Sequence, residues 1–407
     1  MNSDQQAARY VFAYDVGTTG CKASLYRLDT RLTLVGSALE EYPLHVQPGG
    51  GVEQSADDWW RAIGRATRAA LSKAQVSADS VQGLAFCAQM QGLVVVGRDG
   101  QVLRPPMSYM DSRASEQIAR HFYAGLFKFG KWNARKLLRW LQVTGAAAAS
   151  VKDPLWKYLW LKANEPEVYS AIHAWLDVKD YLNLRATGVV RMGQDSANAT
   201  FLYDTRHGRL GWHHGLCRTY GVNPAHLPPV IRSTDVVGML TASAAWDLGL
   251  PVGTPVFGGG GDLSMIALGA GAVRPGITHC YVGTSGWVSS TVERRMTDVQ
   301  GMVGSILGAV PGCYNYISEL ETAGRCLQWV RDHLALDEIG IYLERQRPDD
   351  KLDEYQSLYE YLNKAVSETA PGADGLLFAP WLHGSRSPFE DPHVRGMFFN
   401  IGLGTKK

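Results

Sequence analysis

A short turn of small residues between two apolar segments places the strongest constraint on how this chain folds. Residues 11–13 and 23–26 are largely apolar, and the turn 17–20 between them is rich in Gly and Thr. Two extended segments joined by such a turn predict a β-hairpin. Asp15 stands at the end of the first strand, where a carboxylate can hold a metal ion. An ordinary hairpin with an acid near its turn explains the same pattern, so the turn alone does not decide between the two.

The residues of this turn are suited to binding a phosphate. Gly17 carries no side chain, so the N–H groups of the turn and the hydroxyls of Thr18 and Thr19 can face an anion. Lys22 adds a positive point charge. The segment is not a Walker A loop, because it lacks the G-x-x-x-x-G-K-[ST] pattern running into a helix.

Length and composition narrow the class of protein. A chain of 407 residues is too long for one compact core, so two domains are expected. The formal net charge of +1 gives no electrostatic reason to expect nucleic acid or an anionic membrane as a partner. The six cysteines form no C-x-x-C pair, which favours a reducing compartment and argues against a zinc site. Residues 1–10 lack the apolar segment of a signal peptide, and no run approaches about 20 apolar residues, so a cytoplasmic location is expected.

Polar side chains follow a predicted buried strand in the first half of the chain. The strand is expected over 81–87, and a new strand starts at Leu93. Gln89, Met90 and Gln91 stand between the two. Polar side chains at a strand end of an α/β protein often face a ligand. A plain polar turn explains the segment equally well.

Tyr109, Asp111 and Arg113 alternate along a later polar segment. An aromatic face beside a carboxylate and a guanidinium suits a polyol, which stacks on the ring and forms paired hydrogen bonds. Asp111 or Ser112 could instead cap a helix over 113–122, and both roles can hold together.

The second half of the chain repeats the arrangement of strand, small residues and acid. Four glycines, residues 258–261, end a predicted strand, and Asp262 follows at the expected start of a helix. Glycine lets the main chain approach a ligand, and a helix N-terminus favours negative charge. A further strand over 277–282 leads into a second Gly/Thr/Ser turn, residues 283–286. Two such turns, one in each half, indicate a duplicated fold that binds a nucleotide.

Together these segments resemble the FGGY family of carbohydrate kinases, and most of all its xylulose-kinase-like branch. The resemblance spans nearly the whole chain in the family's order. The segments that carry it are Asp15-Val16-Gly17-Thr18-Thr19 with Lys22, Gln89-Met90 with Gly92, Asp111-Ser112-Arg113, Asp177 with Lys179-Asp180-Tyr181, the block 258–262 and Gly283-Thr284-Ser285-Gly286. The first of the family's two signature patterns is met only in part, around Lys157-Tyr158 and Trp160-Leu161.

The resemblance implies an α/β fold of two ribonuclease-H-like domains, of the actin and sugar-kinase type, with a cleft between them. The N-terminal domain is expected over 1–254 and the C-terminal domain over 255–407. ATP and Mg²⁺ are expected on one side of the cleft and a sugar deep within it. The implied activity is ATP-dependent phosphorylation of a sugar hydroxyl, with a pentulose such as xylulose as substrate. The expected partners are this sugar and a second copy of the chain, as a homodimer.

The resemblance also implies a role for each matched position. Asp262 resembles the catalytic base and a sugar contact, and Asp15 resembles the carboxylate near Mg²⁺. The phosphate motifs correspond to Gly17, Thr18, Thr19 and Lys22 in the first turn and to Gly283, Thr284 and Ser285 in the second. The other sugar contacts correspond to Gln89, Met90, Gln91, Tyr109 and Asp111. One base, one metal carboxylate and two donor-rich turns supply the positioning and charge neutralisation that phosphoryl transfer needs.

The sequence departs from the family pattern in three places. Gln91 stands where xylulose kinases have His, and Tyr109 stands where many members have Trp, so both changes concern sugar recognition. The chain ends at Lys407, soon after segments 384–388 and 396–403 that resemble the start of the family's second signature. On this basis the C-terminal part is expected to be lacking and the second domain incomplete.

Two other functions fit parts of the pattern. A chain without its C-terminal part would bind sugar and be impaired in catalysis, which a titration with ATP would reveal. An actin- or chaperone-like ATPase would share the fold and hydrolyse ATP without a sugar. The segments around Gln89 and Tyr109 argue against the ATPase, because such proteins have no buried sugar pocket.

Overall fold

The computed structural model describes residues 8–283, 285–334, 358–389, 391 and 393–405. Contacts divide the chain into two units. Unit 1 comprises the residues up to 277 together with 290–297 and 305–316, and unit 2 comprises 278–289, 298–304 and the residues from 317 on.

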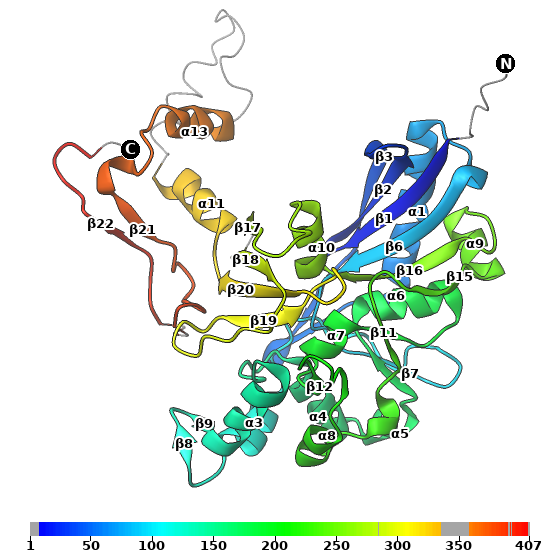
Figure 1. Ribbon diagram of the computed structural model, residues 1–407, viewed down its shortest axis with the longest axis horizontal. Helices are drawn as coiled ribbons and strands as arrows, with labels where there is room; N and C mark the ends of the chain where they lie inside the picture. Colours follow the sequence, from blue (N-terminus) through cyan, green and yellow to red (C-terminus); the bar gives the residue numbers. More distant parts are fainter. Residues whose placement is uncertain (1–7, 284, 335–357, 390, 392, 406–407) are drawn as a thin grey trace, which may run out of the picture. The chain divides into compact units, whose positions relative to one another are not determined.

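A six-stranded sheet is the framework of unit 1 (Figure 1). Its strands, from one edge to the other, are β15 (Val236–Met239), β16 (Pro255–Gly261), β6 (Val81–Ala88), β1 (Arg9–Val16), β2 (Gly20–Leu28) and β3 (Leu32–Glu41). β1, β2 and β3 pair antiparallel, as β15 does with β16, whereas β1, β6 and β16 run parallel. The predicted hairpin is confirmed, because β1 and β2 pair in continuous register as far as Val16 and Cys21.

The side chains of β1 divide between the two faces of this sheet. Phe12, Tyr14 and Val16 are buried, whereas Ala13 and Asp15 are exposed. Successive side chains of a strand point to opposite faces. One face of the sheet therefore belongs to the core, and the other carries Asp15.

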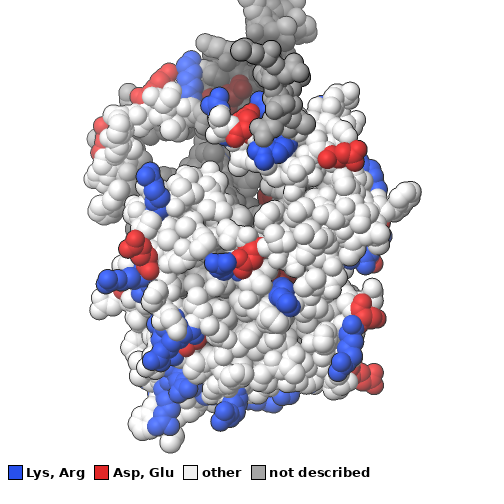
Figure 2. Space-filling view, turned by 45° about the vertical axis from the view of Figure 1, so that its right-hand side comes forward, with Lys and Arg blue, Asp and Glu red and all other residues white. Residues whose placement is uncertain are grey.

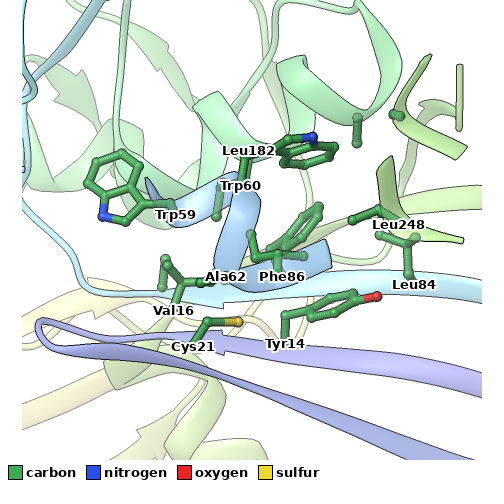
Figure 3. Packing of buried hydrophobic residues seen from close by; sticks show 14 of the residues in the cluster. Tyr14, Val16, Cys21, Trp59, Trp60, Ala62, Leu84, Phe86, Leu182 and Leu248 are labelled. Carbon is green, nitrogen blue, oxygen red and sulfur yellow. The ribbon is translucent and has the colours of Figure 1, made fainter. Parts of the chain in front are cut away.

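Three helices pack on the core face: α1 (Ala56–Ala74), α6 (Val178–Thr187) and α9 (Ala242–Leu248). α1 begins as the sequence predicts, since the Ser55 hydroxyl accepts a hydrogen bond from the Asp58 N–H at 3.2 Å. Trp59 and Trp60 of α1 lie in one cluster with Tyr14 of β1 and side chains of β6 and α6 (Figure 3). Burial of each large apolar side chain contributes about 1.5–3 kcal/mol, so this core fixes the strands that carry the site.

Unit 1 continues into a region of short helices and two-stranded pairs. Its helices are α2 (Ser115–Ile118), the π-helix Ala119–Tyr123, α3 (Ala134–Thr144), α4 (Pro154–Asn164), α5 (Pro166–Ala171), α7 (Gln194–Ala199) and α8 (His214–Tyr220). Its paired strands are β4 (His45–Gln47) with β5 (Gly51–Glu53), β7 (Val94–Val96) with β10 (Ala174–Leu176), β8 (Lys128–Phe129) with β9 (Trp132–Asn133), β11 (Met192–Gly193) with β14 (Val230–Ile231), and β12 (Tyr203–Asp204) with β13 (Gly211–Trp212). Single 3₁₀ turns occur at Pro48–Gly50, Ala78–Ser80 and Pro224–His226. Aromatic packing holds these helices together, with the Trp140 ring stacked on Tyr220 at a centroid distance of 4.5 Å.

A four-stranded sheet follows α10 (Asp262–Gly269) along the chain. Its order is β17 (Thr278–Val282), β18 (Gly286–Val292), β20 (Tyr314–Leu320) and β19 (Gly304–Leu307). The later described residues of unit 2 form α11 (Gly324–His333), α13 (Leu358–Ser367), a 3₁₀ turn at Ala373–Gly375, and the antiparallel pair of β21 (Leu377–Ala379) and β22 (Met397–Phe399).

The boundary between the two units lies later in the chain than the predicted boundary after Thr254. β16 and α10 follow that residue, and both belong to unit 1. The reason is that β16 pairs in parallel with β6 and thereby extends the first sheet. Such pairing between distant segments leaves little trace in the local sequence. Asp262 consequently lies in the same unit as Asp15.

Within the described ranges, no helix has the length and apolar character needed to cross a bilayer. Figure 2 shows basic and acidic side chains on the same face, with the basic ones gathered toward the bottom of the view. No single sign covers this face, in keeping with the net charge of +1.

Candidate functional site

Three parallel strands of unit 1 end in the same row of the sheet. Val16 of β1 pairs with Ala88 of β6, and Ala88 pairs in turn with Gly261 of β16. The carboxyl ends of parallel strands are where α/β proteins bind ligands. The first turn, residues 17–20, the segment from Gln89 and the acid Asp262 therefore all begin at one edge of the sheet.

Asp262 is the first residue of α10 and is half-buried. Its Oδ1 accepts a hydrogen bond from the N–H of Leu263 at 2.8 Å. The helix N-terminus favours the ionised carboxylate, which is the form that accepts a proton. The residue before it, Gly261, donates its N–H to Oδ2 of buried Asp195 at 2.7 Å. Asp195, which the sequence did not single out, thus fixes the main chain next to Asp262.

The glycines before Asp262 make close contacts within the protein. Gly259 has φ of +64°, and a Cβ placed there would lie 2.1 Å from the carbonyl oxygen of Phe86. A Cβ on Gly261 would lie 2.1 Å from Cγ of Met90. The approach of a ligand to these glycines stays a prediction, and the protein atoms nearest to them belong to neighbouring segments. Met90 accordingly packs on the main chain beside Asp262.

Asp15 lies on the open face of β1, in register with Lys22 across the hairpin. Partial removal from water raises the pKa of Asp15, while the positive charge of Lys22 opposes the shift. Its Oδ1 is 3.9 Å from Sγ of Cys87. Burial, with the carboxylates of Asp15 and Asp262 nearby, raises the pKa of Cys87, so the thiol stays protonated between these acids.

The first turn is held by side chains from two other segments. The Tyr42 hydroxyl donates to the carbonyl oxygens of Gly17 and Gly20 at 2.6 and 3.0 Å. The amide of Gln54 donates to the carbonyl oxygen of Thr18 at 2.7 Å. These bonds occupy carbonyl oxygens, so they leave the hydroxyls of Thr18 and Thr19 to serve other partners. Tyr42 and Gln54 were missed from the sequence because their contacts join distant segments.

The predicted sugar-contact residues Gln89 and Tyr109 lie next to this turn. Nε2 of Gln89 donates to Oε1 of Gln54 at 2.6 Å, and the Thr18 hydroxyl donates to the Tyr109 hydroxyl at 3.4 Å. Gln89 is buried, and its Oε1 has no hydrogen-bond partner among the residues that the structure describes. Such an oxygen favours a donor such as a sugar hydroxyl. The side chain of Tyr109 is 38% exposed and provides an accessible aromatic ring.

Asp111, also predicted to contact sugar, is instead buried and hydrogen-bonded to other residues of the protein. Its exposed fraction is 0%, and its oxygens accept hydrogen bonds from Nε and Nη2 of Arg113 and from the Val52 N–H. Arg113 also stacks over the Trp160 ring, 4.6 Å from its centroid. A carboxylate with these partners has no oxygen open to a ligand. Asp111 does not cap a helix either, because the residue before α2 is Ala114, without a side-chain cap.

The second turn, between β17 and β18, belongs to unit 2. The Gly283 N–H donates to the Ser285 carbonyl oxygen at 2.9 Å, and the Gly324 N–H donates to the Gly283 carbonyl oxygen at 2.7 Å. Thr284, the third residue predicted here, lies outside the described residues. A Cβ on Gly283 would lie 2.3 Å from the Tyr281 hydroxyl oxygen, so a larger residue there would have to displace that side chain.

Asp15 is an exposed carboxylate near the first turn, a position from which it could contribute one ligand to a divalent cation. No group of three His, Cys, Asp or Glu side chains in the described part of the chain could enclose a metal ion by itself. Mg²⁺ commonly binds through one or two carboxylates and the phosphates of a substrate. One exposed carboxylate beside the turn fits that mode of binding.

Family models and known proteins match this chain over almost its whole length. The model of the N-terminal domain of the FGGY family of carbohydrate kinases matches residues 10–269, and the model of its C-terminal domain matches residues 279–407. The C-terminal domain is thus represented, and the expectation that the C-terminal part is lacking is not borne out.

Among known proteins, a xylulose kinase of Bacillus subtilis (strain 168) is 30% identical over 97% of this chain and 72% of its own length. A gluconokinase of the same organism is 25% identical over 98% of this chain and 72% of its own length. The crystal structure of xylulose kinase from Rhodospirillum rubrum superposes with a TM-score of 0.78 at 25% identity, covering 98% of this chain and 74% of that one. The predicted two-domain α/β fold of the sugar-kinase type is confirmed by this similarity.

Proposed function

This chain belongs to the FGGY family of carbohydrate kinases and is therefore a sugar kinase, and on that premise we propose that its acceptor is a pentulose such as xylulose. The proposal is supported by the similarity to a protein named xylulose kinase. One observation carries the assignment of roles. Val16, Ala88 and Gly261 pair side by side at the ends of their strands, so the three candidate segments that follow them begin at one edge of the sheet.

Asp262 is the proposed general base. Its carboxylate takes the proton of the acceptor hydroxyl while that oxygen forms a bond to the γ-phosphorus of ATP. The bond from the γ-phosphorus to the bridging oxygen breaks, and ADP leaves. A positioned general base contributes about 10²–10⁴-fold to such a step. The place of Asp262 at a helix N-terminus, on a main chain fixed by Asp195, supports this role.

Asp15 and the two small-residue turns are the proposed phosphate and metal ligands. Kinases of this family use ATP with Mg²⁺, which neutralises charge on the phosphates when bound. Asp15 would hold that ion. In unit 1 the turn contributes Gly17, Thr18 and Thr19, and Lys22 adds charge. In unit 2 the proposed contributors are Gly283, Thr284 and Ser285.

The proposed sugar contacts are Gln89, Met90, Gln91, Tyr109 and Asp262. The open oxygen of Gln89 accepts from a sugar hydroxyl, and the Tyr109 ring provides a surface for a carbon face. Asp111 is left out of this set, because its carboxylate accepts hydrogen bonds from Arg113 and from the Val52 N–H. We assign it to holding these two segments rather than to contacting the sugar. A homodimer and a cytoplasmic location stay predictions.

The test is ADP release by the full chain with Mg²⁺ and ATP, measured against xylulose, ribulose, xylitol and gluconate. We expect the highest kcat/KM with a pentulose and loss of that turnover in Asp262→Asn. Gluconate as the preferred substrate would overturn the proposed sugar. ADP release that is equally fast without any sugar would favour an actin- or chaperone-like ATPase and overturn the proposal as a whole.

A further inference from the structure

Gln91 has a main-chain conformation that is unusual for a residue with a side chain. Its φ angle is +63°, in the left-handed region where a Cβ is crowded and glycine is the usual occupant. Such strain persists only where the surroundings fix the main chain, and it is concentrated at binding sites. The partners of Gln91 therefore indicate what the strain serves.

Asp177 holds the N–H side of this peptide. Its Oδ2 accepts from the Gln91 N–H at 2.9 Å, and its Oδ1 accepts from the Gly92 N–H at 2.9 Å and from the Val178 N–H at 2.8 Å. Asp177 is 5% exposed and caps α6. A Cβ on Gly92 would lie 3.1 Å from Oδ1, so a larger residue there would crowd this contact.

Lys157 of α4 holds the carbonyl side of the same residue. Its Nζ donates to the carbonyl oxygen of Gln91 at 2.8 Å and to that of Ser108 at 2.7 Å. The side chain is 0% exposed. Burial of an ammonium group is costly, and these hydrogen bonds go to two carbonyl oxygens rather than to a carboxylate. The two carbonyls belong to the two segments that carry the candidate sugar contacts.

We infer that Lys157 and Asp177 are positioning residues for the sugar site, where they fix Gln91 from both sides and set its distance from Tyr109. The inference rests on the proposed function, because it assigns Gln91 and Tyr109 to the sugar. Lys157 joins Gln91 to Ser108, the neighbour of Tyr109, through one nitrogen atom. This nitrogen therefore sets the distance between the segment of Gln91 and the segment of Tyr109. That distance determines which polyol fits between the two segments.

A purely structural role for the buried lysine predicts a different outcome. It would lower stability when removed and would change the kinetic constants for both substrates alike. A positioning role affects the sugar KM far more than the ATP KM, because both carbonyls lie in sugar segments. Displacement of Gln91 and Tyr109 would weaken one or two hydrogen bonds to the sugar, so a rise of roughly 10-fold in the sugar KM is expected.

The experiment compares Lys157→Met with Lys162→Met in the full chain. Both lysines lie on α4, and Lys162 also donates to a carbonyl oxygen, that of Gly221 at 2.8 Å, away from the site. We expect Lys157→Met to raise the sugar KM and to leave the ATP KM within about twofold, and Lys162→Met to leave both unchanged. Asp177→Asn, which keeps the shape of the side chain, provides a second variant if Lys157→Met does not fold.

A double-mutant cycle with Gln91→Gly tests whether the lysine acts through Gln91. Glycine adopts a positive φ without strain and removes the side chain. If the inference is right, adding Lys157→Met to the Gln91→Gly variant raises the sugar KM by less than about threefold, because the side chain that the lysine positions is already absent. Equal factors in both backgrounds, or a parental sugar KM in Lys157→Met, would overturn it. A parent chain that no sugar stimulates would instead refute the proposed function.

Discussion

Asp262 and Asp111 are carboxylates of the same unit with very different surroundings. Asp262 is half-buried at the start of α10, where its Oδ1 accepts the N–H of the next residue. Asp111 is fully buried between the Arg113 guanidinium and the Val52 N–H. The first is the proposed proton acceptor, and the second joins two segments of the chain through Arg113 and the Val52 N–H. Burial separates the two surroundings, because Asp111 has no exposed surface whereas Asp262 is only half-buried.

The largest effect is expected from replacing the accessible carboxylate. Asp262→Asn keeps the shape of the side chain and removes the proton acceptor, so kcat should fall by about 10²–10⁴-fold. Steady-state assays with sugar and ATP, together with a thermal melt, measure this. The melting temperature should stay close to that of the parent. Asp79→Asn, in an exposed turn, is the matched control. Activity within a few-fold of the parent would remove Asp262 from the mechanism.

The opposite result is expected at the buried carboxylate. Asp111→Ala leaves the Arg113 guanidinium with Glu53 as its remaining ion-pair partner, and the unfolding free energy should fall by about 3 kcal/mol. Denaturant titration gives this value. Asp29→Ala breaks an exposed pair with Arg27 and should leave the curve unchanged. Should the stability of Asp111→Ala match the parent while its sugar KM rises steeply, the residue would be a sugar contact after all.

Asp15 provides an intermediate case, an acid that is exposed and faces a turn. Asp15→Ala should raise the KM for Mg·ATP by about tenfold, or 1.4 kcal/mol, with a smaller change for sugar. Varying each substrate in turn at saturating levels of the other separates the two constants. Collapse of sugar affinity with unchanged nucleotide affinity would place Asp15 on the sugar side of the site.

A fourth carboxylate, Asp177, sharpens the comparison through pH. Burial raises the pKa of Asp177 from 3.8 to about 7. Between these values the folded chain binds a proton that the unfolded chain has lost, so stability falls as pH rises, by about 1.4 kcal/mol per pH unit. Burial lowers the pKa of Lys157 from 10.5 to about 7, which makes stability rise with pH above 7. The stability of the parent relative to Asp177→Asn should therefore decline from pH 5 to 7 and then level off. A constant difference across that range would contradict the assignment.

The local parts of the fold were predictable from the sequence. The hairpin around Asp15, the Ser55 cap of α1 and the start of α10 at Asp262 all depend on residues close together in the chain. For the candidate site, the sequence predicted that its segments follow strand ends, and β1, β6 and β16 do end immediately before them. The contacts of Gln54, Asp177 and Lys157 were not predictable, because each joins segments far apart in sequence. For the same reason neither the burial of Asp111 nor the sheet partner of β16 could be read from the local pattern.

The pairing of β16 with β6 has a consequence for synthesis of the chain. The meander of β1, β2 and β3, with α1, consists of neighbours in sequence and can form soon after it leaves the ribosome. β16 joins this sheet by pairing with β6, with Val256 opposite Leu84. This pairing can form only after a far longer stretch of the chain has been synthesised. Asp262 follows that strand directly. Asp262, the proposed general base, is therefore synthesised after the other candidate residues at this end of the sheet. On the proposed mechanism, a nascent chain cannot transfer a phosphoryl group until β16 has been made and has paired with β6.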